Sequence, residues 1–303
     1  MAEPPASLPP PPPPPPPPAP PPEAGGSFTL RLRPLGFGEL LDEVFRVYRR
    51  HFWLFVSIAL VLALPTLVLQ IVSGQADQIG FTASLLSSAM RGGGTLDSRP
   101  PDTNFAALGL LYVASIVLIP FLEGAITLAA IDLALGRPAT LSSTFRQVLG
   151  RYWPLLGLAL LALLLVPVFC CIPVFVWILV RWSVAVPVLL AERRGPVQAI
   201  QRSWELTRDN WWRLFGILVV VVLIQAVLNS VLGFVALPIA IAIPFVSNGV
   251  RGAVAATVGT LGSALVTPIL YLSVVLLYFD LRIRKESFDL DQLASQVPGG
   301  PQP

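Results

Sequence analysis

The sequence predicts an all-α, polytopic integral membrane protein, and two observations support that fold class. The first is composition: the chain is 54% hydrophobic and 12% charged, with a mean hydropathy of +0.74. A soluble domain carries about 25% charged residues, so this chain has too few to solvate a globular surface. The second is a threefold pattern in which an amphipathic segment passes through an aromatic pair into an apolar stretch. Together they make the lipid bilayer the solvent of most of the chain.

The three copies of the pattern share one aromatic spacing. They read FRVYRRHFWLF, FRQVLGRYWPLL and WELTRDNWWRLF and are anchored on Trp53, Trp153 and Trp212. One aromatic residue directly precedes each anchor and another lies eight residues before it; these are Phe45, Phe52, Phe145, Tyr152, Trp204 and Trp211. Each copy sits where a helix would enter a bilayer. We therefore predict three tandem repeats, each with one cytoplasmic amphipathic elbow helix and two transmembrane helices.

Composition divides the chain into three regions. Residues 1–26 hold 15 prolines, ten of them consecutive from Pro9 to Pro18, which predicts a disordered cytoplasmic arm in the extended polyproline II conformation. A spacer is the simpler interpretation of this arm, and a docking site for a protein partner with an aromatic groove is the alternative. Residues 27–290 are expected to form a six-span membrane domain, and residues 291–303 a disordered cytoplasmic tail.

Hydrophobic periodicity places the helices inside the membrane domain. We expect spans at about 52–73, 107–134, 153–168, 171–190, 211–233 and 254–280, and elbow helices at 36–51, 139–151 and 195–210. A polar, Gly-rich loop is expected at 74–105, and an irregular stretch containing Pro238 and Pro244 after the fifth span. Small residues near the start of the sixth span, from Gly252 to Ala264, predict close packing against another helix.

The basic residues orient this arrangement. Sixteen of the 20 Lys and Arg residues fall on one side of the six spans, three fall on the other, and Arg181 lies within a span. The positive-inside rule then places both termini and all three elbows in the cytoplasm.

Two charges at membrane depth are candidates for a polar site, because an isolated charge in hydrocarbon is costly. Glu123 and Arg181 lie at similar depths on the second and fourth spans, so we predict that they form an ion pair. A structural pair that fixes helix register and a functional polar cavity are both open at this point. Asp132 and Asp280 lie at the cytoplasmic ends of their spans, where a salt-bridge cluster is the simpler interpretation.

The elbows predict contact with anionic lipid headgroups at the cytoplasmic face. The candidate interface residues are Arg46, Arg49, Arg50, Trp53, Arg151, Trp153, Arg202, Arg208 and Trp212. We expect no cofactor, no metal and no nucleic-acid partner. Enzymatic activity is not expected, because the single histidine, His51, lies among basic residues and no nucleophile has an evident base.

Three blocks of the sequence resemble the membrane-domain family of glycerophosphoryl diester phosphodiesterases. They are RPLGFGELLDEVFRVYRRHF (33–52), RWSVAVPVLLAERRGPVQAIQRSWELTRDNWWRLFG (181–216) and LLYFDLRIRKESFDL (276–290), within a resemblance that covers roughly 30–290. Some members carry a soluble phosphodiesterase barrel after this domain, but its His-Arg-Gly segment and metal-binding carboxylates are absent from this sequence. The resemblance implies a bacterial cell-membrane protein with a lipid-linked role, and transfers no catalytic residue.

These features favour a non-catalytic membrane protein that acts as a scaffold or accessory module in a lipid or envelope process. The alternative is a small transporter or lipid-handling permease with a polar site around Glu123 and Arg181.

Overall fold

A computed structural model describes residues 36–90, 104–242 and 247–295, and in these ranges the regular structure is helical throughout. The proline-rich arm at 1–26 and the last eight residues of the tail lie outside the described residues. The elements, in chain order, are α1 (Phe37–Arg50), α2 (Phe52–Val72), α3 (Gln75–Met90), α4 (Phe105–Ala134), α5 (Leu141–Leu163), the 3₁₀ helix η1 (Val166–Cys170), α6 (Ile172–Trp182), α7 (Ala185–Ala191), α8 (Pro196–Thr207), α9 (Trp211–Ala242) and α10 (Asn248–Ser295).

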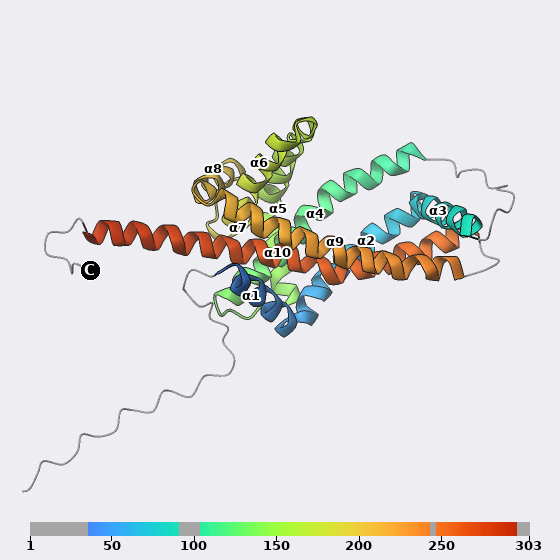
Figure 1. Cartoon of the computed structure of the whole chain (residues 1–303), viewed down its shortest axis with the longest axis horizontal. Coiled ribbons are helices and arrows are strands. Elements are labelled where there is room, and N and C mark those ends of the chain that lie inside the picture. Colours follow the sequence, from blue (N-terminus) through green and yellow to red (C-terminus); the bar gives the residue numbers. More distant parts are fainter. Residues whose placement is uncertain (1–35, 91–103, 243–246, 296–303) are drawn as a thin grey trace, which may run out of the picture.

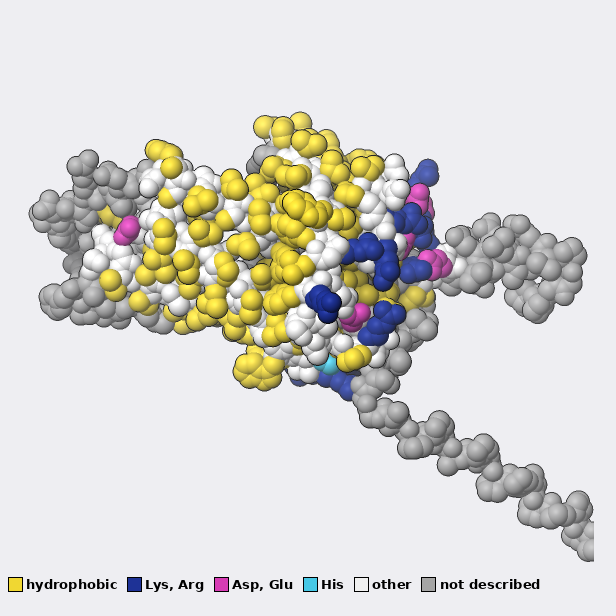
Figure 2. Space-filling view, turned by 180° about the vertical axis from the view of Figure 1, so that it is seen from behind, with side chains coloured by type: hydrophobic (Ala, Val, Ile, Leu, Met, Phe, Trp, Pro, Cys, Tyr) yellow, Lys and Arg dark blue, Asp and Glu magenta, His cyan; other side chains and the backbone are white. Residues whose placement is uncertain are grey.

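Five helical stretches of the described residues are long and apolar enough to cross a membrane. They are Phe52–Val72, Phe105–Ala134, Ile172–Ala191, Trp211–Ala236 and Asn248–Glu286. Their apolar side chains face outward along much of their length, and Figure 2 shows the hydrophobic surface extending over most of the molecule. A surface of this kind is stable in lipid and not in water, so the protein is an α-helical membrane protein.

The long helix α10 is the axis of the fold (Figure 1). It is 48 residues long and packs against α1, α2, α3, α4, α7, α8 and α9. Its middle section is fully enclosed at Leu272, Leu277, Tyr278 and Leu281. The α5–α6 hairpin projects away from this axis, and α6 rests on α8 and α9 instead.

Helix α1 is amphipathic as predicted, and its apolar face docks on the axis. Leu40, Val44 and Val47 are buried on that face, and the hydroxyl of Tyr48 donates to the backbone carbonyl of Leu265 at 2.6 Å. Burial raises the pKa of Tyr48 to about 12, so the hydroxyl remains a donor at neutral pH. The first elbow is therefore fixed to the sixth predicted span by a specific polar contact.

The prediction of a polar loop at 74–105 is wrong for residues 75–90, which form helix α3. The reason is a helix crossing that local sequence does not reveal. A Cβ atom added at Gly80 of α3 would overlap the backbone carbonyl of Asn248, and one added at Gly252 of α10 would overlap that of Ala76. The two glycines let the helix backbones touch, and this tertiary contact makes a helix of a segment with little apolar periodicity.

Three other boundaries differ from the sequence predictions. The second elbow is not a separate helix, because α5 runs from Leu141 through Pro154 to Leu163 without a break. Helix α9 continues through Pro238 to Ala242, where an irregular stretch was predicted. Helix α10 continues to Ser295, past the predicted end of the membrane domain. Proline inside a helix is tolerated in membranes, where neighbouring groups satisfy the freed backbone carbonyls.

The α3–α10 crossing gives a direct test of this architecture. Gly252→Ala is expected to lower the free energy of unfolding by about 1–3 kcal/mol, because the new methyl group forces the two backbones apart. The matched control is Gly259→Ala on the same helix, where an added Cβ meets no atom within 4 Å. Thermal unfolding of both variants in detergent measures the difference, and equal melting temperatures would contradict the crossing.

Candidate functional site

The three anchor tryptophans are exposed to nearly the same extent. Trp53, Trp153 and Trp212 are 79%, 78% and 78% exposed, respectively. The aromatic residue before each anchor is partly buried; Tyr152, for example, donates a hydrogen bond to the carbonyl of Val117 at 3.0 Å. An indole that projects freely from a membrane protein beside basic side chains has the amphipathic character of residues at the bilayer–water interface.

Basic side chains gather at one end of the molecule, which we term the basic end (Figure 2). It is formed by α1, α8, the last turns of α4 and α7, the start of α5 and residues 282–285 of α10. Of the predicted interface residues, Arg46 pairs with Glu43 at 2.8 Å, and Arg202 lies within 3.5 Å of three carboxylates, Glu192, Glu205 and Glu286. Arg49, Arg50 and Arg208 are exposed, and Arg151 is half-buried on α5.

Glu123 lies in an apolar cavity of about 310 Å³ between α4, α5, α6 and α7. Apart from Glu123, the cavity wall is mostly aliphatic and aromatic, with Leu155, Phe175 and Trp182 among its members. Among the described residues, none forms a hydrogen bond or an ion pair with the Glu123 carboxyl group. A lone carboxyl group in such surroundings is destabilising for the fold.

Arg181 is held by a different set of groups. Its guanidinium lies 5.5 Å from the ring centroid of Trp177 and 5.4 Å from that of Trp204. It also donates to the backbone carbonyl of Trp204 at 3.5 Å. The predicted ion pair with Glu123 is therefore wrong. The positive charge is compensated by two aromatic faces, and this contact joins α6 to α8.

Asp280 lies in a salt-bridge cluster, the simpler of the two interpretations of this residue. Its buried carboxylate accepts from Arg213 of α9 and, at 3.0 Å, from Arg284 of α10. Asp132 has another environment: it is buried at the end of α4, and the side chain of Gln147 donates to it at 3.1 Å. The two aspartates thus do not form one site.

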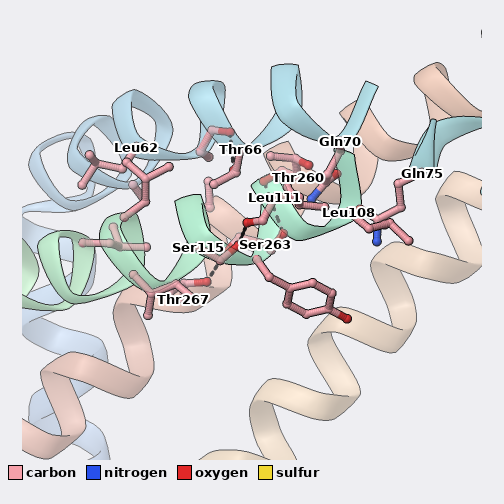
Figure 3. A pocket seen from close by; sticks show the side chains of 17 residues that line it. Leu62, Thr66, Gln70, Gln75, Leu108, Leu111, Ser115, Thr260, Ser263 and Thr267 are labelled. Atoms are coloured by element: carbon pink, nitrogen blue, oxygen red, sulfur yellow. Dashed lines mark hydrogen bonds between the residues drawn. The ribbon is translucent and has the colours of Figure 1, made fainter. Parts of the chain in front are cut away.

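A second cavity, of about 380 Å³, lies between α2, α4 and α10 near the start of α3 (Figure 3), and we term it the central cavity. Among the residues that the structure describes, its lining carries no charge. Its polar lining includes the amides of Gln70 and Gln75 and the hydroxyls of Thr66, Ser115, Thr260, Ser263 and Thr267. Ser115 and Thr267 donate to carbonyls one turn earlier on their own helices, at 2.8 and 2.7 Å. Their oxygen atoms therefore remain able to accept bonds from a guest.

Sequence reasoning missed the central cavity. The available signal was the i, i+4 spacing of Thr66 and Gln70 on α2 and of Ser263 and Thr267 on α10, which puts each pair on one helix face. Such spacing is also typical of simple packing, and only the relative rotation of three helices brings the two faces together.

The fold and the polar groups at membrane depth define a multi-pass α-helical membrane protein. Comparison with protein families places its second half more narrowly: residues 158–287, from the end of α5 into α10, match the family described as membrane domain of glycerophosphoryl diester phosphodiesterase. This match confirms the resemblance found in the sequence for that part of the chain, and it leaves α1–α4 uncovered. Comparisons with curated proteins and with solved structures found no match.

The environment of Glu123 predicts the effect of removing its charge. Glu123→Leu is expected to raise the free energy of unfolding by about 1–3 kcal/mol, because an unpaired polar group is exchanged for one that suits the apolar wall. Glu123→Gln keeps a polar group in the cavity, so its increase in the free energy of unfolding should be smaller than that of Glu123→Leu. Thermal unfolding in detergent measures both variants. A lower melting temperature for Glu123→Leu would show that the carboxyl group makes a stabilising contact in the protein.

Proposed function

We propose that this protein is a non-catalytic, multi-pass module of the bacterial cell membrane that associates with anionic lipids at its basic end and serves a lipid or envelope process as an accessory or scaffold. The observation that carries this proposal is the equal exposure of Trp53, Trp153 and Trp212 beside arginine-bearing helices. Three indoles presented alike from three separate helices fit a shared contact with the headgroup region. The family matched by residues 158–287 is itself a membrane domain, which supports the same reading.

The proposed topology has six spans in three repeats, with both termini and all elbows in the cytoplasm. Five stretches qualify as spans by length and composition. The remaining span, which is the third in chain order, would be the apolar part of α5 together with η1. From Tyr152 to Leu163 this part of α5 covers only ~18 Å at ~1.5 Å per residue, against a hydrocarbon core of ~30 Å. The 3₁₀ helix that follows supplies the remaining length in a full crossing. A half-depth hairpin of α5 and α6 is the competing arrangement.

The two cysteines distinguish these arrangements. Cys170 and Cys171 are exposed, lie at the α5–α6 tip and are the only cysteines in the sequence. If both helices cross, a membrane-impermeant maleimide should label the tip from the extracytoplasmic side of intact cells. Reference variants in a Cys170→Ser/Cys171→Ser background are Thr140→Cys at the basic end and Ser247→Cys between α9 and α10. If Ser247→Cys is labelled from the extracytoplasmic side and the native Cys170 and Cys171 are not, the half-depth hairpin is favoured and the six-span topology is wrong.

Native mass spectrometry tests the lipid association. The full chain, extracted with its own membrane lipids, is expected to retain several anionic lipids, and Arg49→Gln/Arg208→Gln should retain fewer, because each exposed arginine near the surface contributes about 1 kcal/mol of attraction. Arg194→Gln is the matched control, since its side chain is engaged by Glu192 at 2.8 Å. Retention that does not favour anionic over zwitterionic lipid in the unaltered protein would refute the proposal.

A lipid-handling permease is the second candidate function, and the central cavity is the observation that favours it. At about 380 Å³ the cavity falls in the range of small-ligand pockets, and its uncharged hydroxyls and amides suit a polar, neutral guest. If transport runs through this cavity, Ser263→Leu should abolish lipid movement between the leaflets of reconstituted vesicles while leaving α1 docked. Under the accessory proposal, that variant has no effect on lipid retention at the basic end.

The proline-rich arm adds a protein partner to the proposal. A run of ten consecutive prolines is the kind of sequence that aromatic-lined grooves of peptide-binding domains recognise. Deletion of residues 1–26 would then release a co-extracted protein, whereas a spacer arm predicts no such loss.

A further inference from the structure

A pocket of about 500 Å³ lies between the end of α4, the start of α5 and the end of α7, and we term it the arginine pocket. Four arginines line it: Arg137 follows α4, Arg146 and Arg151 lie on α5, and Arg193 follows α7. Leu128, Ile131 and Leu190 form its apolar part. Residues from three helices thus converge on one hollow at the basic end.

The four arginines of this pocket have no acidic partner among the described residues. Within the described part of the chain, no carboxylate lies within ion-pair distance of Arg137, Arg146, Arg151 or Arg193. Five basic residues of α8, α9 and α10 behave differently: Arg202, Arg213, Arg282, Arg284 and Lys285 each have a carboxylate within 3.5 Å. The basic end therefore holds arginines that pair with carboxylates of the protein and, in the arginine pocket, four arginines without such a partner among the described residues.

Asp132 is the one carboxylate among the described residues that line the pocket, and it does not neutralise the four arginines. Asp132 is buried and accepts a hydrogen bond from Gln147. With four arginines against one aspartate, the pocket has a formal charge of +3. Like charges that converge on a concave surface repel one another, and an anion placed among them removes that repulsion.

The backbone at Arg193 gives an independent indication. This residue has φ +55°, and it is the only non-glycine residue with positive φ in the described ranges. It stands just after α7, at the position where glycine commonly ends a helix. An L-residue with a long side chain is disfavoured in this left-handed conformation, and such residues concentrate at functional sites. Glycine would be the better choice for the fold alone.

We propose that the arginine pocket binds a phosphate-bearing anion. The guanidinium group offers paired N–H donors that match two phosphate oxygens, and several arginines can share one phosphate. The apolar part of the pocket suits the first carbons of an attached acyl or alkyl chain. A phospholipid headgroup and a water-soluble phosphate ester share the recognised chemistry. This inference deepens the proposed lipid association by giving it one defined site.

The experiment compares two probes on the full chain in zwitterionic detergent micelles. One probe is dioleoyl phosphatidylglycerol, titrated by native mass spectrometry, and the other is glycerol 3-phosphate, titrated by calorimetry. Arg146→Gln and Arg151→Gln should each weaken binding about tenfold or more, because each removes a charge-assisted contact to the phosphate. Arg194→Gln, which makes the same change of charge one residue from Arg193, should bind as the unaltered protein does.

Arg193→Gly separates ligand binding from folding. Glycine relieves the left-handed backbone, so this variant should melt at a higher temperature than the unaltered protein and yet bind the probe more weakly. A purely structural role for Arg193 predicts no loss of binding. This variant keeps the proposal falsifiable even if the α5 substitutions fail to fold.

The two probes distinguish the sources of the phosphate. If both probes bind and the pocket variants weaken both, the site recognises the phosphate group alone. If only the lipid binds, the site recognises a phospholipid headgroup in its membrane-like setting. Binding of neither probe, or equal binding by all variants, overturns the arginine pocket. The wider lipid association is tested separately. It predicts that Arg49→Gln/Arg208→Gln, in which the arginine pocket is intact, retains fewer anionic lipids.

Discussion

The packing of α10 against its neighbours is the constraint on which the rest of the structure depends. Lipid tails are as apolar as leucine, so helices in a bilayer gain little from hydrophobic burial and must be held by close contact and polar groups. α10 uses both. Gly252 brings its backbone onto α3, and Asp280 binds Arg213 of α9. The carbonyl of Leu265 accepts from Tyr48 of α1, and Tyr278 donates to Glu192 beside α7 at 3.2 Å.

This axis explains why the charges at the basic end fall into two groups. Arg202 of α8 and Arg213 of α9 hold helices together, since they pair with Glu286 and Asp280 of α10. Helices α4 and α5 meet through apolar contacts such as Gly124 against Leu155 and through the Gln147–Asp132 hydrogen bond, and no ion pair of the described residues joins them. Because no ion pair of the described residues uses the arginines of the arginine pocket, their charges are available to a ligand.

The polar groups at membrane depth show how a membrane protein compensates a buried charge in more than one way. Arg181 is stabilised by two indole faces and a carbonyl, which also join α6 to α8. Glu123 has no such compensation in the described structure, and the uncharged central cavity lies apart from it between α2, α4 and α10.

The sequence by itself determined the class of the protein, the limits of α1, α2 and α4, the three aromatic anchors and the concentration of arginine, because composition and 3.6-residue periodicity are properties of the chain alone. Only the tertiary structure decided that residues 75–90 form a helix, that Arg181 faces tryptophans rather than Glu123, and that Arg137, Arg146, Arg151 and Arg193 share one pocket. Similar depth in a membrane does not fix the direction in which a side chain points. That direction depends on how each helix is rotated about its axis, and the rotation is set by contacts between residues far apart in the chain.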